Sequence, residues 1–233
     1  NVVRPLDLKD KYGLDAFRYF LLRDMVFGLD SNFSEEAFVQ RLNSDLANDL
    51  GNLVSRTITM AVKYGAGKVP AVTPQQYDHT LQDAAARTVA EVKICFEEMS
   101  LHKVLIAIWE LINITNKYIV EKEPWSLGKD PANQTKVMAI MYNLLAALRA
   151  IAILISPFMP GTAQKILKQI GVAGQEKIDL AQVGKWDALC AGSSLTRGES
   201  LFPRIEKDKP APAKEKAAID LKPEIDYEEF AKV

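Results

Sequence analysis

The chain has 233 residues, of which 48% are hydrophobic and 25% are charged, the composition of a globular protein with a substantial core. Its formal net charge is −1, so the strongly basic balance that marks many nucleic-acid-binding chains is absent. Any affinity for nucleic acid must therefore come from a local patch and from contacts with bases.

Helical periodicity begins near the N-terminus. A short helix is expected at about 6–12 and ends at Gly13, and a second helix is expected over 14–24. The segment 26–33 is expected to be irregular or briefly extended.

The next helix, expected over about 35–64, carries two distinct stripes. Ser34 can cap its start. Apolar residues spaced by three or four positions form a core stripe: Phe38, Leu42, Leu46, Leu50 and Leu53. A polar stripe off the core face contains Asn48, Asn52 and Arg56, each one turn after the last.

The rest of the chain continues the helical pattern after a loop at 64–74. Long helices are expected at three further stretches: 75–99, 101–121 and 132–156. A shorter helix is expected from Gly161 to Gly171. The sequence therefore predicts an all-α bundle of about five long helices with small accessory elements.

One apolar stretch, residues 137–155, is long enough to raise the question of a membrane span. Arg149 lies well inside it, and an arginine there costs about 2.5–3.5 kcal/mol even on lenient insertion scales. A buried central helix, with no membrane partner, is the better interpretation.

The cysteines Cys95 and Cys190 and the histidines His79 and His102 are not clustered in a metal-ligand pattern, so we expect no metal site. The first residues contain no apolar run of a secretory signal. Two unclustered cysteines without such a signal favour the reduced cytoplasm.

No constellation of catalytic residues stands out. The sequence contains no nucleophile elbow and no phosphate-binding glycine loop, and its carboxylates are scattered along helix surfaces. We therefore expect no catalytic residues in this chain.

Three residues form a candidate binding set. Asn52 and Arg56 lie one helical turn apart and offer the donors and acceptors that bond base edges, and Trp125 follows Pro124 just after a helix end. Proteins read single-stranded RNA loops by stacking bases on aromatic rings and bonding their edges. On spacing alone, a solvated helix face and a partly buried tryptophan explain the same pattern.

Several segments resemble class I aminoacyl-tRNA synthetases. Residues 1–24, NVVRPLDLKDKYGLDAFRYFLLRD, are similar to the segment after the KMSKS loop of these enzymes. Residues 33–56, FSEEAFVQRLNSDLANDLGNLVSR, resemble the opening anticodon-domain helix of methionyl-tRNA synthetases in particular. Three further segments resemble the same family, in the family's order: NKYIVEKEPW (116–125), ISPFMPGTAQKI (155–166) and LFPRIE (201–206).

The resemblance implies roles for particular residues. In that family an asparagine and an arginine four residues apart, together with a tryptophan after a proline, read the anticodon CAU; these roles fall on Asn52, Arg56 and Trp125. The resemblance also brings Asn48 and Asn116 into the neighbourhood of the site.

One position departs from the pattern. Some members carry an acidic residue where this chain has Val120, which puts the family's way of excluding wrong anticodons in doubt here.

The resemblance also implies a division of the chain. It predicts four parts, namely a stem-contact segment (1–33), the anticodon-binding bundle (34–170), a closing segment packed on the bundle (171–206), and a flexible linker leading into a truncated tRNA-binding domain (207–233). The dense charge and prolines after Glu206 independently favour a linker.

The family joins methionine to its tRNA using ATP. The resemblance places the catalytic domain, with ATP, magnesium and zinc, before Asn1, so this chain is expected to be inactive alone and to hold no cofactor. The expected partners are methionine tRNA, the catalytic domain and, through a C-terminal domain, a second copy of the protein.

Two alternatives remain open. The bundle resembles that of the synthetases for cysteine, isoleucine, valine and leucine, although the GNLVSR and EPW segments favour methionine. A helical protein-interaction module without an RNA role is favoured by the near-neutral charge.

Overall fold

The computed structural model describes residues 4–25, 33–73, 76, 78–172 and 179–205. Within these ranges the regular secondary structure is helical, apart from one isolated antiparallel bridge between Lys68 and Ser194. The predicted all-α fold is therefore confirmed. The predicted linker at 207–233, and most of the irregular segment at 26–33, lie outside the described residues.

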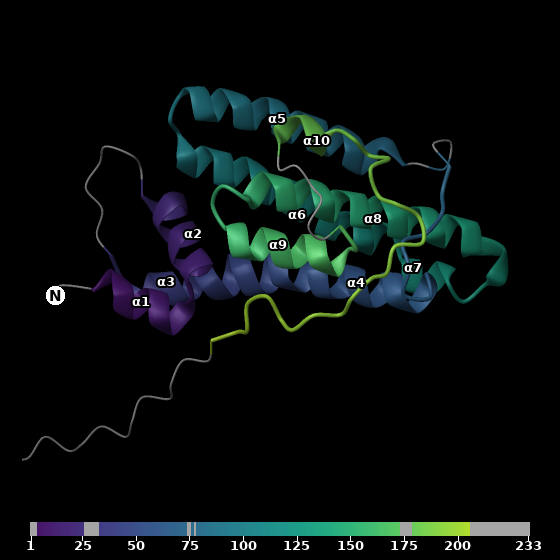
Figure 1. The fold of residues 1–233 in the computed structure, drawn as a ribbon, viewed down its shortest axis with the longest axis horizontal. Helices are drawn as coiled ribbons and strands as arrows, with labels where there is room; N and C mark the ends of the chain where they lie inside the picture. The colour runs from purple at the N-terminus through teal and green to yellow at the C-terminus, as the bar shows by residue number, and fades with distance from the viewer. Residues whose placement is uncertain (1–3, 26–32, 74–75, 77, 173–178, 206–233) are drawn as a thin grey trace, which may run out of the picture.

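Two short helices stand at one end of an elongated bundle (Figure 1). They are α1 (Pro5–Tyr12) and α2 (Leu14–Asp24), joined at Gly13, whose φ of 89° favours glycine. Tyr19 of α2 is fully buried, with its ring centroid 4.4 Å from that of Trp109 in the bundle. The described part of the N-terminal segment is thus packed into the same core as the bundle.

A helical rod forms one edge of the bundle. It consists of α3 (Glu35–Arg41), a π-helix η1 (Leu42–Gly51) and α4 (Asn52–Tyr64). The cap at Ser34 is confirmed, because its side chain accepts a hydrogen bond from the backbone N–H of Ala37. The predicted core stripe is also confirmed, since its five members are buried.

The helix predicted over about 35–64 is present as a continuous helical rod, but its middle is not α-helical. Residues Leu42–Gly51 wind as a π-helix, a form found mostly as short insertions in α-helices and frequently at functional sites. The wider winding ends at Gly51, where a Cβ atom would lie 2.9 Å from the carbonyl oxygen of Leu46. A side chain at this position would therefore collide with the backbone.

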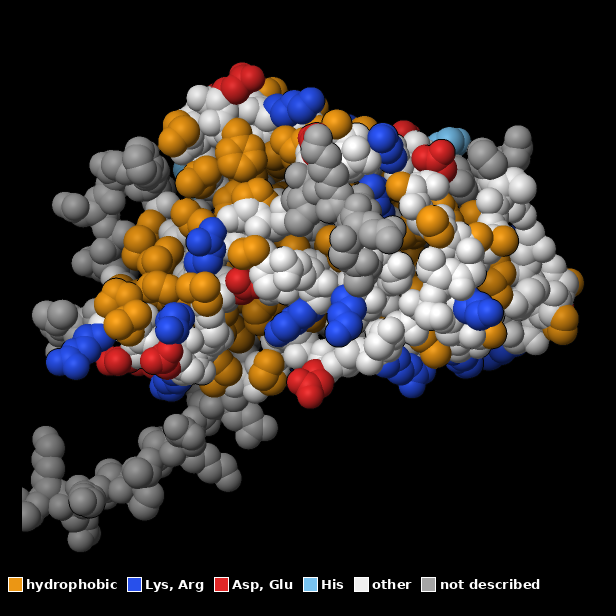
Figure 2. Space-filling view, viewed as in Figure 1, with side chains coloured by type: hydrophobic (Ala, Val, Ile, Leu, Met, Phe, Trp, Pro, Cys, Tyr) orange, Lys and Arg blue, Asp and Glu red, His pale blue; other side chains and the backbone are white. Residues whose placement is uncertain are grey.

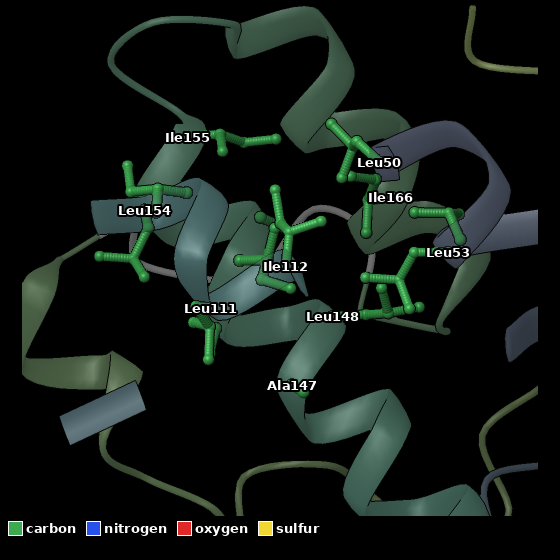
Figure 3. Packing of buried hydrophobic residues seen from close by; sticks show 14 of the residues in the cluster. Leu50, Leu53, Leu111, Ile112, Ala147, Leu148, Leu154, Ile155 and Ile166 are labelled. Carbon is green, nitrogen blue, oxygen red and sulfur yellow. The ribbon is translucent and has the colours of Figure 1, made fainter. Parts of the chain in front are cut away.

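The other long helices pack against this rod. They are α5 (His79–Glu97), α6 (Leu101–Lys122) and α8 (Gln134–Ile155), with the shorter α9 (Pro160–Gln169) after them. Figure 3 shows Leu53, Ile112 and Leu148, from α4, α6 and α8, converging in the interior. The core therefore lies where three helices meet.

Helix α8 is the one helix of the described chain long and apolar enough to cross a membrane, and 89% of its apolar window is buried inside the protein. Its Arg149 is only 2% exposed and donates hydrogen bonds to the carbonyl oxygens of Gln182 (2.9 Å) and Lys185 (3.2 Å). The buried guanidinium is thus hydrogen-bonded to carbonyl oxygens in and just after the short helix α10 (Leu180–Val183), as expected for a charged side chain inside a protein core.

The segment after α9 lies along the bundle. Trp186 is buried and donates its indole N–H to Asn143 Oδ1 of α8 at 2.8 Å. Further along, the side chain of Asn43 in η1 bonds both the N–H and the carbonyl of Ile205, at 2.8 Å each. These contacts tie the end of the described chain to the π-helix.

Helix α9 begins with a cap supplied from far away in the sequence. Its first turn has no side-chain cap of its own, and Asp15 of α2 accepts hydrogen bonds from the backbone N–H of Thr162 (2.5 Å) and from its hydroxyl (2.8 Å). Asp15→Ala is therefore expected to lower the free energy of unfolding by about 1 kcal/mol, measured by urea denaturation. Asp15→Asn, which keeps an acceptor, is the control; identical curves for all three proteins would contradict the capping role.

Candidate nucleic-acid interface

The polar stripe predicted on the rod is present on its surface. Asn52 is exposed at the start of α4, Arg56 is half-buried one turn later, and Asn48 is exposed one turn earlier in η1. The opposite side of α4 is buried through Leu53, Val54, Thr57 and Ile58. Neither Asn52 nor Arg56 makes a hydrogen bond or ion pair with the described part of the chain, so both keep free hydrogen-bonding groups.

Trp125 is presented by a sharp turn at the end of α6. Glu123 adopts a left-handed conformation (φ 41°, ψ 55°), which stops the helix at Lys122. The short helix α7 (Pro124–Leu127) follows, with the N–H groups of Ser126 and Leu127 bonded to the carbonyl of Glu123. Pro124, the first residue of this helix, is buried, whereas Trp125 is 41% exposed.

Two contacts bring these elements together. Asn116 of α6 donates from Nδ2 to the carbonyl of Asp49 in η1 at 3.3 Å. Beyond α7, a Cβ atom at Gly128 would lie 2.6 Å from the ring of Tyr64, the last residue of α4. The stretch 116–128 therefore runs alongside the stretch 49–64, with α7 near the end of α4 (Figure 1).

The candidate face consists of Asn52, Arg56 and Trp125, with Asn48 and Asn116 beside them. Asn48 is exposed, and Asn116 is half-buried and joins the two stretches. Val120, the departure from the family pattern, is 55% exposed on the adjoining part of α6. An apolar side chain therefore stands at the surface beside the candidate face.

The charge on the side of the molecule shown in Figure 2 is mixed, with basic and acidic side chains interspersed. On α6 itself Lys117 is paired with Glu121 at 3.4 Å. Base contacts, more than phosphate attraction, are what the candidate face offers.

The side chains of the candidate face are suited to binding a ligand, and none of them is a typical catalytic group. The candidate face offers an indole for stacking and amide and guanidinium groups for base edges, with no acid–base pair or nucleophile among them. Among the described residues no group of three or more His, Cys, Asp or Glu side chains could hold a metal ion. Sequence reasoning missed one supporting feature, the ion pair between Lys122 and Asp78, because its partners lie on different helices.

Comparison with protein families gives two matches along the chain. Residues 69–219 match the model of the anticodon binding domain of methionyl tRNA ligase, and residues 1–58 match that of the class I (M) tRNA synthetases.

Individual relatives agree with these matches. The methionine–tRNA ligases of Caldanaerobacter subterraneus and Bacillus subtilis are 43% and 39% identical over 242 and 259 residues, covering 100% of this chain and 38% of each relative. The crystal structure of free Mycobacterium tuberculosis methionyl-tRNA synthetase superposes with a TM-score of 0.79 and 36% identity, covering 89% of this chain and 42% of that one. The chain spans little more than a third of its curated relatives. It belongs to the methionyl-tRNA ligase family and contains that family's anticodon-binding domain.

Proposed function

We propose that this chain recognises the CAU anticodon of methionine tRNA as part of a methionine–tRNA ligase. Asn52, Arg56 and Trp125 are the residues that we assign to the task. The observation that carries the proposal is that an exposed indole on one stretch, 116–128, and an unpaired guanidinium and amide on another, 49–64, lie on two stretches that run side by side.

The proposed mechanism is selective binding of an opened anticodon loop. Trp125 stacks on one unstacked base, and Asn52 and Arg56 bond the edges of bases next to it. A correct base leaves no polar group unmatched, whereas a wrong base leaves a desolvated donor or acceptor without a partner. The penalty is about 1–3 kcal/mol for each wrong base.

The proposal also assigns a role to each part of the chain. The described residues of 34–170 form the anticodon-binding bundle, those of 1–33 connect it to the remainder of the ligase and to the tRNA stem, and those of 171–206 close over the bundle. Activation of methionine with ATP and magnesium is assigned to the rest of the cytoplasmic ligase, because this chain spans 38% of its curated relatives and residues 69–219 match the anticodon binding domain.

A binding titration tests the proposed function. The chain is titrated with an anticodon hairpin carrying CAU and with hairpins changed at one anticodon position each, at two salt concentrations. The CAU hairpin is expected to bind about 5- to 150-fold more tightly than each changed hairpin. The ratio is expected to survive the higher salt, since phosphate contacts weaken with salt but carry no sequence information. Equal affinities for all hairpins would refute anticodon reading, and no binding at all would favour a protein-interaction module.

A further inference from the structure

The exposed tryptophan depends on a turn that its own residues do not favour. Glu123 holds a left-handed conformation that non-glycine residues rarely adopt, and such conformations persist only where the surroundings enforce them. The turn sets the direction of α7 and hence the position of Trp125. Something outside α7 must therefore hold the end of α6 in place.

An ion pair joins that end of α6 to the start of α5. Lys122, the last residue of α6, places its Nζ atom 2.6 Å from Oδ2 of Asp78. The same ammonium lies 5.2 Å from the ring centroid of Tyr118, one turn earlier in α6 and only 2% exposed. Lys122 is thus held between a carboxylate on another element and a ring that cannot move freely.

Asp78 is itself fixed. It is the N-cap of α5, and its Oδ1 atom accepts hydrogen bonds from the backbone N–H (3.0 Å) and the hydroxyl (2.6 Å) of Thr80. Burial alone would raise the pKa of Asp78, but the hydrogen bonds from Lys122 and Thr80 outweigh it and lower the pKa to about 2. The carboxylate therefore remains ionised, and the ion pair remains intact, at neutral pH.

The space behind α7 explains why the ion pair matters. A pocket of about 260 Å³, open to the surface, lies between the ion pair and α8 and is lined by Leu127 of α7 together with Asp78, Tyr118, Lys122 and Asn143. Leu127 packs against the core, but the pocket beside it leaves the short helix room to move when the ion pair is lost. Buried Pro124, the packing of Leu127 and the contact of Gly128 with Tyr64 also restrain this helix.

We propose that Asp78 and Lys122 are positioning residues that hold α6 so that the Glu123 turn presents Trp125 to a base. The inference rests on the proposed function, since it assigns these two residues to the base-stacking tryptophan. Neither residue is assigned a contact with RNA. Their effect is to keep the binding-competent orientation of Trp125 populated before the anticodon arrives.

The test separates charge from capping. Asp78→Asn removes the charge but keeps a good N-cap, and Lys122→Met removes the ammonium but keeps the apolar stem. The ion pair is half-buried, with side chains 40% and 27% exposed, so both variants of the 233-residue chain are expected to melt at a slightly lower temperature than the original and to remain folded at the temperature of the titrations. Lys122→Arg keeps the charge and is expected to retain function. Glu98→Gln, which removes the ion pair with Lys103 (3.7 Å) at the other end of α6, is the matched control.

The fluorescence of Trp125 can be used to follow the mobility and exposure of its own side chain. Trp109 and Trp186 are 6% and 3% exposed, so subtracting the emission of Trp125→Ala in each background isolates the accessible indole. Asp78→Asn and Lys122→Met are expected to lower the anisotropy of Trp125 and raise its quenching by acrylamide. If the competent orientation falls to about a tenth of the molecules, the Kd for the CAU hairpin rises about tenfold.

The outcomes separate this inference from the proposed function. Unchanged Trp125 fluorescence and hairpin affinity in both Asp78→Asn and Lys122→Met, beside weakened binding by Trp125→Ala, would overturn the positioning role alone. Normal hairpin binding by Trp125→Ala would overturn the proposed role of the tryptophan, and with it the reason for positioning it.

Discussion

Replacing Arg56 with alanine is expected to weaken binding of the CAU hairpin by about 1.5–3 kcal/mol, a loss of roughly 10- to 150-fold. The guanidinium has no partner within the described chain, so its hydrogen-bonding capacity is available to the anticodon. A fork of fixed donors reads a base edge in two places at once, which a smaller side chain cannot do. The loss is therefore expected to fall on the cognate hairpin more than on the changed ones, and discrimination declines with affinity.

Hairpin titrations of two variants at Arg56 measure this effect. Arg56→Gln keeps hydrogen bonding without the fork or the charge and is expected to lie between the original chain and Arg56→Ala. Thermal melts of both should match that of the original, because no described ion pair or hydrogen bond is lost. Unchanged discrimination in Arg56→Ala would remove this residue from the site.

The features of the fold that depend on local periodicity were predictable. The apolar stripe from Phe38 to Leu53 is buried because every third or fourth side chain of a helix falls on one face. The π-helical winding at Leu42–Gly51 was not predicted, since α- and π-helices use similar residues and differ in which carbonyl each N–H selects. That choice depends on packing, such as the bond between Asn43 and Ile205, which are 162 residues apart.

The candidate site likewise has features that local spacing predicts and features that depend on contacts between separate elements. The pairing of Asn52 with Arg56 follows from spacing alone, and Pro124 signals that a helix ends before Trp125. The exposure of Trp125 follows from the left-handed glutamate at position 123, and sequence patterns give little warning of that conformation in a residue other than glycine. The cap of α9 by Asp15 and the ion pair of Asp78 with Lys122 join separate elements, so no periodicity could reveal them.

Replacing Leu148 with alanine is expected to lower the free energy of unfolding by about 2–5 kcal/mol. The side chain is fully buried on α8, where it meets side chains of α4 and α6 (Figure 3), and alanine would leave a cavity there. Leu6→Ala is the matched control, because Leu6 is 67% exposed on α1 and the same substitution should change stability by less than about 0.5 kcal/mol. Urea denaturation of the three proteins measures both values, and equal losses would contradict the assignment of Leu148 to the core.

The same variant connects the core with the candidate face. Helix α4 presents Asn52 and Arg56 on one side and buries Leu53 on the other, so the packing of α4 on α8 fixes where the polar groups stand. Leu148→Ala should therefore lower both stability and hairpin affinity, whereas Arg56→Ala should lower affinity alone. A Leu148→Ala protein that is destabilised yet binds the CAU hairpin with full affinity would show that α4 keeps its place without this contact, and that the remaining core suffices to hold the face.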